Sequence, residues 1–278
     1  MLVPTAAIIN NAVTTHTGIG AFNIITLEHA EAVITGAETA HQPVLLQISQ
    51  NCVTFHGGRL LPIARAATAL AAEATVPVAL HLDHVNDEIL LHQAADAGCG
   101  SVMFDASHLD YADNIAATRK AADWAHTHHL WIEAELGAIG GKDGAHTPGV
   151  RTDPDEAHTF VNATGVDALA VAVGSSHAMA HRTATLDHNL ITRLRDTVPV
   201  PLVLHGSSGV PDDQLRAAVR HGMVKINIGT ALNVAFTGAL RDHELPTDPR
   251  KYLAPARTAM ADTVAHLLGV LSTPGSPA

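Results

Sequence analysis

Aromatic residues are scarce in this chain of 278 residues, at 3% of the sequence, although 47% of it is hydrophobic. The core is therefore expected to consist mainly of Ala, Val, Leu and Ile. Aliphatic runs of this kind are typical of parallel strands that are buried on both faces. The length suits one large α/β domain, since α/β barrels commonly run to roughly 250 residues as one unit.

Other features are also missing, and each absence excludes a class of protein. The two cysteines, Cys52 and Cys99, do not have the spacing of a metal-binding pair, so we expect reduced, buried thiols in a cytoplasmic protein. Lys and Arg total 16 against 27 Asp and Glu, and they form no basic cluster for nucleic acid. No uncharged apolar stretch reaches the roughly 18 residues of a membrane helix, and the N-terminal segment lacks the pattern of a secretory signal.

Eight short apolar or β-branched runs recur along the chain, each followed by a longer amphipathic segment. Strands that alternate with helices predict a parallel sheet, and eight such units predict a (β/α)8 TIM barrel that forms a single domain over 1–271. An open doubly wound sheet is the alternative, but it usually has a glycine-rich turn after its first strand, where this chain reads FNIITLEHA. A last helix is expected over 256–271, and the tail 272–278 is expected to be disordered. The expected strands are 20–25, 43–49, 77–83, 101–107, 130–136, 168–174, 201–207 and 223–229.

The segment HLDH at 81–84 is the most informative part of the sequence. It ends an apolar run and places Asp83 and His84 at the carboxyl end of a predicted strand. His177 and His205 end similar runs. Because barrels of this kind build their sites at the carboxyl ends of the strands, three imidazoles from three strands predict a metal site. Any one of them alone would be better explained as a core histidine bonded to the backbone, so the prediction depends on their number.

Acidic side chains follow the same strands. Glu135 and Asp105 could supply a further metal ligand, an alternative metal position, or carboxylates that orient the imidazoles. Asp83 could give and take a proton while a metal polarises a substrate oxygen, or it could only orient a histidine. Because successive strand residues point to opposite faces, Asp83 and His84 can share one site only if the strand ends or kinks there.

Two segments of small residues indicate an anion site. Gly206-Ser207-Ser208-Gly209 follows the seventh strand, and Asn227-Ile228-Gly229-Thr230 leads into the last barrel helix. The loops after strands seven and eight often hold phosphate in such barrels, because they expose backbone N–H groups at a helix N-terminus. A flexible turn explains the first segment equally well when it is taken alone.

The motifs HLDH, SVMFDAS, IEAELG, LAVAVGSSH, LVLHGSSG and KINIGT occur in the order and spacing of a known family. From about Asn10 to Met260 the sequence resembles the class II, zinc-dependent ketose-bisphosphate aldolases. Gly229 lies where fructose-type enzymes carry an aspartate and tagatose-type enzymes a small residue, so the tagatose-bisphosphate branch is the closer one. The resemblance implies a cytoplasmic lyase of carbohydrate metabolism, a homodimer or homotetramer without nucleic-acid or membrane partners. It would reversibly cleave a ketose bisphosphate of the tagatose or fructose type to dihydroxyacetone phosphate and an aldehyde.

The resemblance also implies a role for individual residues. Zn²⁺ would be the cofactor, with a Na⁺ or K⁺ ion beside the phosphate, and Asp83 would be the proton donor. The metal ligands would be His84, His177 and His205, with Asp105 and Glu135 as auxiliary acids near the metal. The residues that hold dihydroxyacetone phosphate would be Gly206, Ser207, Ser208, Asn227, Ile228, Gly229 and Thr230. Asn23, Ser49 and Arg250 would contact the distal phosphate.

The sequence departs from the family pattern at two places. Ala178 replaces a glycine whose backbone approaches the phosphate. The loop after the fifth strand reads GGKDG at 140–144, where the family carries an essential glutamate: either Asp143 replaces it with a shorter reach, or one residue has been deleted. Two alternatives therefore stay open: a silent paralogue that binds zinc and sugar phosphates, or an aldolase for a different ketose phosphate.

Two other enzyme classes compete with this interpretation. A Schiff-base aldolase needs a buried lysine, and Lys225 on the eighth predicted strand is the only plausible one. A barrel metallohydrolase would typically carry a His-x-His pair on its first strand, which here reads AFNIIT.

Overall fold

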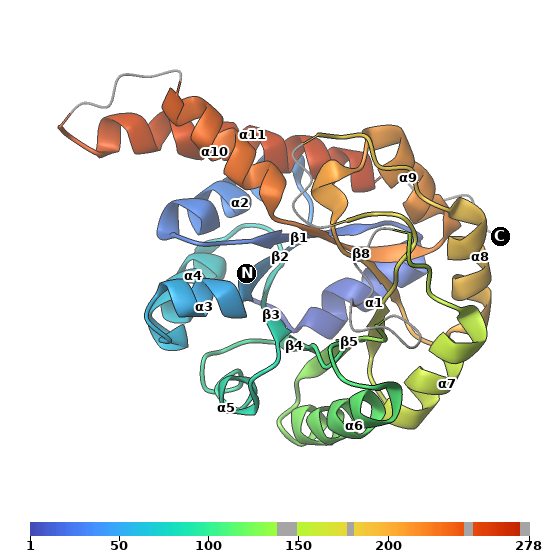
Figure 1. Ribbon diagram of the computed structural model, residues 1–278. Coiled ribbons are helices and arrows are strands. Elements are labelled where there is room, and N and C mark those ends of the chain that lie inside the picture. Colours follow the sequence, from blue (N-terminus) through green and yellow to red (C-terminus); the bar gives the residue numbers. More distant parts are fainter. Residues whose placement is uncertain (138–148, 177–180, 242–246, 273–278) are drawn as a thin grey trace.

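The strands of the computed structural model close into one parallel barrel, which confirms the predicted (β/α)8 TIM barrel (Figure 1). The structure describes residues 1–137, 149–176, 181–241 and 247–272. All eight predicted strands are present, and each pairs with its neighbours in chain order, with β8 returning to β1. The strands are β1 Ile19–Asn23, β2 Val44–Ser49, β3 Val78–Val85, β4 Ser101–Phe104, β5 Trp131–Glu135, β6 Ala168–Ala170, β7 Leu202–Leu204 and β8 Met223–Ile228.

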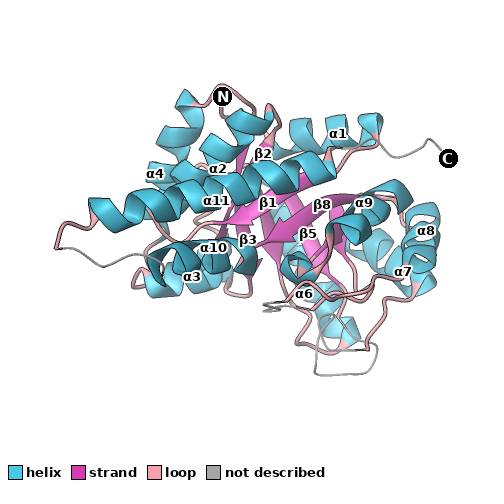
Figure 2. Cartoon of the chain, turned by 90° about the horizontal axis from the view of Figure 1, so that it is seen from above, coloured by secondary structure: helices cyan, strands magenta, loops and turns pink. Residues whose placement is uncertain are grey.

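Helices surround the barrel (Figure 2). A continuous, mainly aliphatic layer of buried side chains fills the space between them and the strands. The helices are α1 Thr5–Thr15, α2 Leu27–Ala40, α3 Gln50–Phe55, α4 Leu60–Glu73, α5 Glu88–Leu91, α6 Tyr111–Thr127, α7 Pro154–Thr164, α8 His188–Thr197, α9 Asp212–His221, α10 Thr230–Arg241 and α11 Arg250–Leu271, with a 3-10 turn, η1, at Ser207–Gly209. None of the described helices has the length and apolar character needed to cross a bilayer.

Helix α11 begins earlier than the sequence predicts. The expected start at 256 is wrong, because the helix already begins at Arg250 and contains Pro255. Pro255 lies in the second turn, where its missing N–H removes one helical hydrogen bond. The rest of the helix packs against α2 and α10, and this burial outweighs the local loss.

Helix α1 precedes the first strand and closes the N-terminal end of the barrel, where it is seen through the ring of strands in Figure 1. Its Ile8, Ile9 and Ala12 form one buried cluster with Ile19 and Ala79, which point into the barrel from β1 and β3. This helix was not among the predicted elements. The closed end of the barrel is therefore apolar and leaves the chemistry to the opposite end.

Above the apolar cluster made with α1, which we call the apolar plug, the barrel interior is polar and charged. Glu133 on β5 and Lys225 on β8 are fully buried and form an ion pair with 2.8 Å between Oε2 and Nζ. Lys225 also donates a hydrogen bond of 2.7 Å to Oδ1 of Asn227, and the second oxygen of Glu133 lies 2.8 Å from Nε2 of His205. Buried charges are tolerated only when they are paired in this way. Lys225 is thus held inside the barrel wall by its partners.

We expect Lys225→Met to lower the free energy of unfolding of the metal-free protein by roughly 3–5 kcal/mol, because it leaves the Glu133 charge buried without its partner. The double variant Glu133→Gln/Lys225→Met should cost clearly less than the two single changes added together. Urea unfolding of the four proteins measures both quantities. Strictly additive costs would show that the two groups do not depend on one another.

Candidate active site

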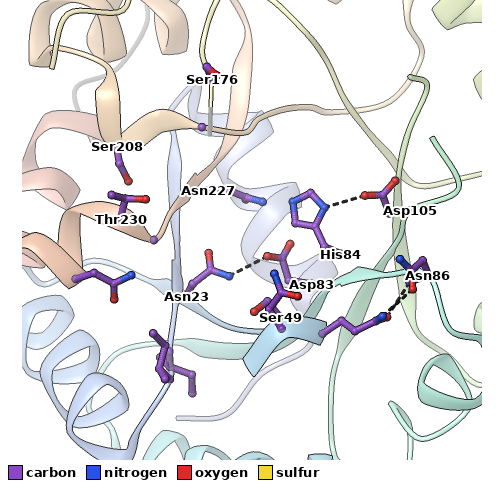
Figure 3. Close-up of a pocket in the computed structure, with 17 residues that line it drawn as sticks. Asn23, Ser49, Asp83, His84, Asn86, Asp105, Ser176, Ser208, Asn227 and Thr230 are labelled. Carbon is purple, nitrogen blue, oxygen red and sulfur yellow. Dashed lines mark hydrogen bonds and ion pairs between the residues drawn. The ribbon is translucent and has the colours of Figure 1, made fainter. Parts of the chain in front are cut away.

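A cavity of about 550 Å³ opens at the carboxyl ends of the strands, a volume within the roughly 300–1,000 Å³ typical of small-molecule sites. The predicted site residues Asp83, His84 and Asp105 lie on one side of it, and Ser208 and Thr230 lie on the other (Figure 3). The remaining lining residues are Asn23, Ile24, Ile25, Ser49, Gln50, Asn51, Asn86, Ser176, Gly206, Asn227, Gly229 and Asn233.

A kink in β3 brings Asp83 and His84 to the same cavity. The pairing of β3 with β4 shifts register between Leu82 and Val85, and His84 has a φ of 51°, in the left-handed region. A bulge of this kind re-aims a side chain that would otherwise point to the opposite face of the strand. The sequence allowed Asp83 and His84 to share one site only if the strand ends or kinks there. The structure has this kink.

Two imidazoles face one another in the site, and each has a carboxylate behind it. Nδ1 of His84 lies 3.0 Å from Oδ2 of Asp105, and Nε2 of His205 lies 2.8 Å from Oε1 of Glu133. The inner nitrogens, Nε2 of His84 and Nδ1 of His205, are 3.1 Å apart. Because a carboxylate only accepts hydrogen bonds, these contacts favour a hydrogen on each outer nitrogen, although Nδ2 of Asn227, a donor, also lies 3.0 Å from Nε2 of His205. When both rings are neutral, as metal binding requires, the inner nitrogens direct their lone pairs at the same space.

This arrangement fits a metal ion. Ligand atoms at about 2.0–2.1 Å from a tetrahedral zinc ion lie roughly 3.3 Å apart, close to the separation of the inner nitrogens. Glu135 completes a group of three, since one ligand atom from each of His84, Glu135 and His205 lies within 4.8 Å of the others. Carboxylates behind metal-binding histidines are the usual means of fixing their tautomer and direction.

Electrostatics in the site favour charged carboxylates. Burial opposes ionisation of Asp105, but its bonds to His84 and Ser107 outweigh burial and hold the pKa of this carboxyl well below its usual range. Burial also opposes ionisation of Asp83, and the positive charges of His84, Lys225 and His205 lower its pKa in turn. For His84, burial is outweighed by Asp83 and Asp105, which raise the pKa of the imidazole to about 9. In the absence of a metal the site therefore attracts positive charge.

Asp83 is held from one side by an amide network. Asn23 donates a hydrogen bond of 2.9 Å from Nδ2 to Oδ2 of Asp83, and Oδ1 of Asn23 accepts one of 3.1 Å from Nε2 of Gln47. The three residues come from the carboxyl-terminal halves of β1, β2 and β3. Only 3% of the Asp83 side chain is exposed, so its carboxylate is fixed in direction and partly shielded from water.

The far side of the cavity offers donors for an anion. Thr230 begins α10, and the hydroxyl of Ser208 accepts a hydrogen bond of 3.1 Å from the backbone N–H of Ala231 in the first helical turn. The N-terminus of a helix attracts negative charge. The side chains of Ser207 and Ile228 are buried and do not line the cavity, so only their backbones could contribute to this end.

Some predicted residues are not brought to the cavity. Arg250 lies at the start of α11, its side chain is 88% exposed, and it pairs with Asp248 at 2.9 Å. His177, Ala178 and Asp143 lie outside the described residues, and Ser176 lines the cavity immediately before the first of them.

The prediction from the sequence missed some residues of the site or gave them no role. Glu133 orients His205, and its position two residues before Glu135 on the same strand is a signal that both point inward. Gln50 and Asn86 connect the loops after β2 and β3, with hydrogen bonds of 2.7 and 2.9 Å. Asn233 lines the cavity one turn into α10, where no motif marks it.

Solved structures of similar chains share this architecture. The YdjI aldolase from Escherichia coli K12 is 33% identical, with 99% of both chains covered and a TM-score of 0.88. A protein of Coccidioides immitis, described as a candidate fructose-1,6-biphosphate aldolase, is 28% identical, with 96% of both chains covered and a TM-score of 0.83. Fructose-bisphosphate aldolase from Campylobacter jejuni is 21% identical over 99% of this chain and 97% of its own, with a TM-score of 0.84, and shows the shared fold alone.

The sequence itself also matches a family model. Residues 3–276 match the family model described as fructose-bisphosphate aldolase class-II, which spans almost the whole chain. The match agrees with the family predicted from the motifs, as does the barrel with His84 lining the cavity and His205 buried beside it. This chain belongs to the class II fructose-bisphosphate aldolase family and is an aldolase, a carbon–carbon lyase.

Proposed function

We propose that this protein is a zinc-dependent aldolase that reversibly cleaves a ketose bisphosphate of the tagatose or fructose type to dihydroxyacetone phosphate and an aldehyde. The observation that carries the proposal is the facing pair of imidazoles, His84 and His205, with a carboxylate behind each and a fixed aspartate beside them. A Schiff-base mechanism is disfavoured, because Lys225 is fully buried and its amino group is engaged by Glu133 and Asn227.

The residues of the chain divide the chemistry among them. His84 and His205 would hold the ion, with Glu135 or His177 as a further ligand. When bound, zinc supplies Lewis acidity for the oxygens of the ketose. Asp83 donates its proton to the aldehyde oxygen and recovers it in cleavage, while Asn23 holds its carboxylate in place. Ser208 and the first turn of α10 bind the phosphate and fix the substrate relative to Asp83.

The rest of the binding site follows from the family resemblance. Gly206, Asn227, Gly229 and the backbones of Ser207 and Ile228 would complete the phosphate site, together with Ala178 and a Na⁺ or K⁺ ion. Asn23 and Ser49 would meet the distal phosphate. Arg250, which is remote from the cavity of its own chain, would do so only across the interface of a homodimer or homotetramer.

Gly229 bears on the choice of sugar. A Cβ atom at this position would lie 3.4 Å from Oδ1 of Asn23, the residue that holds Asp83. This is an ordinary van der Waals distance, so a side chain at this position would contact Asn23, which in turn holds the proton donor. This position supports the tagatose type, and comparison of kcat/KM for D-tagatose and D-fructose 1,6-bisphosphate decides between the two.

Removal of the metal is expected to abolish turnover, and zinc should restore it. His205→Ala should weaken zinc binding by more than the roughly 10–100-fold that loss of an outer carboxylate costs. Elemental analysis after dialysis measures the zinc content. His126→Ala changes an exposed histidine on α6 and should retain full zinc. Equal zinc content in the two variants would contradict the assignment of His205.

Zinc binding at neutral pH is expected to release about one proton from His84, because the metal needs the neutral imidazole. The pKa of His84 is raised to about 9 in the folded protein, so its charge stabilises the metal-free fold fully below 6.5, and this contribution is lost as the pH rises through about 9. Calorimetry in buffers of different ionisation enthalpy counts the protons. Zinc uptake without proton release would contradict this.

Asp83→Ala should lower kcat by roughly 10²–10⁴-fold, the usual contribution of a general acid, and leave zinc bound. Asp123→Ala on the exposed face of α6 is the matched control and should turn over normally. Unchanged turnover in Asp83→Ala would refute the proton-donor role. A wild-type protein that holds zinc but cleaves neither bisphosphate would instead indicate the silent paralogue or a different ketose phosphate.

A further inference from the structure

A chain of hydrogen bonds runs through the barrel interior from the closed end toward the cavity. Oγ1 of Thr5, in the first turn of α1, lies 2.7 Å from Oγ of Ser101, and that atom lies 2.7 Å from Nδ1 of His81. All three side chains are fully buried. These hydrogen bonds link α1, β4 and β3, and they have no role in the chemistry described above.

The series of hydrogen bonds leads toward Asp83. Nε2 of His81 lies 3.9 Å from Oδ1 of Asp83, and neither atom has a hydrogen-bond partner among the described residues. The other oxygen of Asp83, Oδ2, accepts the hydrogen bond from Asn23. A distance of 3.9 Å is too long for a hydrogen bond, but separations in sites without substrate often shorten in the complex.

The charge of Asp83 decides which group donates and which accepts at each step of this hydrogen-bond chain. Burial, with the charge of Lys225 adding to it, lowers the pKa of His81 well below its usual range, so the imidazole is neutral and carries one hydrogen. If the hydrogen is on Nε2, an N–H dipole points at the carboxylate. If it is on Nδ1, a lone pair points at the carboxylate, which is unfavourable. With Nε2 protonated, Nδ1 must accept from Ser101, whose oxygen in turn accepts from Thr5.

A glycine makes the approach of α1 possible. A Cβ atom at Gly100, directly before Ser101, would lie 3.1 Å from Oγ1 and 3.3 Å from the backbone nitrogen of Thr5. These distances are tighter than an ordinary van der Waals contact, so a side chain here would push the hydroxyl of Thr5 away from Ser101. The start of β4 thus admits the helix to hydrogen-bonding distance.

We propose that Thr5, Ser101 and His81 are positioning residues for Asp83: the two hydroxyls supply the hydrogen bond that Nδ1 accepts in the Nε2–H tautomer of His81, and that N–H orients Oδ1 of the carboxylate. The proposal rests on the proton-donor role of Asp83 proposed above. Asn23 holds one oxygen of Asp83 and His81 faces the other, so the plane of the carboxylate is defined from two sides. Helix α1 then contributes to catalysis from the end of the barrel that is remote from the substrate.

The first test separates positioning from folding. Thr5→Val removes the hydroxyl at nearly constant volume, Thr5→Ser retains it, and Thr14→Val makes the same change at an exposed position of α1. With D-tagatose and D-fructose 1,6-bisphosphate as substrates, Thr5→Val should lower kcat by up to about 100-fold and leave KM and zinc content unchanged. Thr5→Ser should recover most of the loss, and Thr14→Val should match the wild type. Equal kcat in Thr5→Val and Thr14→Val, or no recovery in Thr5→Ser, would overturn the proposal.

The second test is independent of turnover. Nitrogen-15 NMR of the zinc-loaded wild type, labelled at histidine, reports which ring nitrogen of His81 carries the hydrogen, and the signal that disappears in His81→Asn assigns it. We expect a neutral ring protonated at Nε2 at neutral pH. A ring protonated at Nδ1, or at both nitrogens, would overturn the proposal even if the Thr5 variants fail to fold. If the wild type cleaves neither bisphosphate, the proposed function fails, and this spectrum still decides the orientation of His81.

Discussion

The structure of this site depends on two imidazoles that are forced to face one another. Asp105 and Glu133 each occupy the outer nitrogen of a histidine, and the inner nitrogens of His84 and His205 meet at 3.1 Å, so that two neutral rings would direct their lone pairs at one point. That convergence is unfavourable unless a positive charge lies between or on the rings. The kink of β3 at His84 makes the arrangement possible, since a regular strand would turn this ring away from His205.

The barrel supports this arrangement by dividing its interior along its axis. The closed end holds the apolar plug made with α1, which excludes water from below. The next layer contains charged groups that must pair because they are buried, above all Glu133 with Lys225. Glu133 also holds His205, and Lys225 also holds Asn227. The stability of the barrel interior and the geometry of the site therefore depend on the same contacts.

The sequence predicted the barrel, and it expected the cavity at the end of the barrel where the structure has it, because strand–helix alternation and the carboxyl ends of strands follow general rules. It placed Asp83 and His84 in one cavity only on condition of a kink, since a register shift depends on pairing with β4. It missed α1, although the positions of its buried residues have helical spacing, and it gave Glu133 no role. The side chain of Ser207 turns away from the cavity because the chain direction after β7 is set by tertiary packing. His177 stays a prediction.

X-ray absorption spectroscopy at the zinc edge tests the central claim most directly. The account predicts that the protein binds one zinc ion tightly, with at least two imidazole nitrogens at about 2.0–2.1 Å in a four-coordinate shell. Replacement of His84 or His205 should remove an imidazole from that shell. A shell made only of oxygen atoms, or a protein that takes up no zinc, would contradict the account.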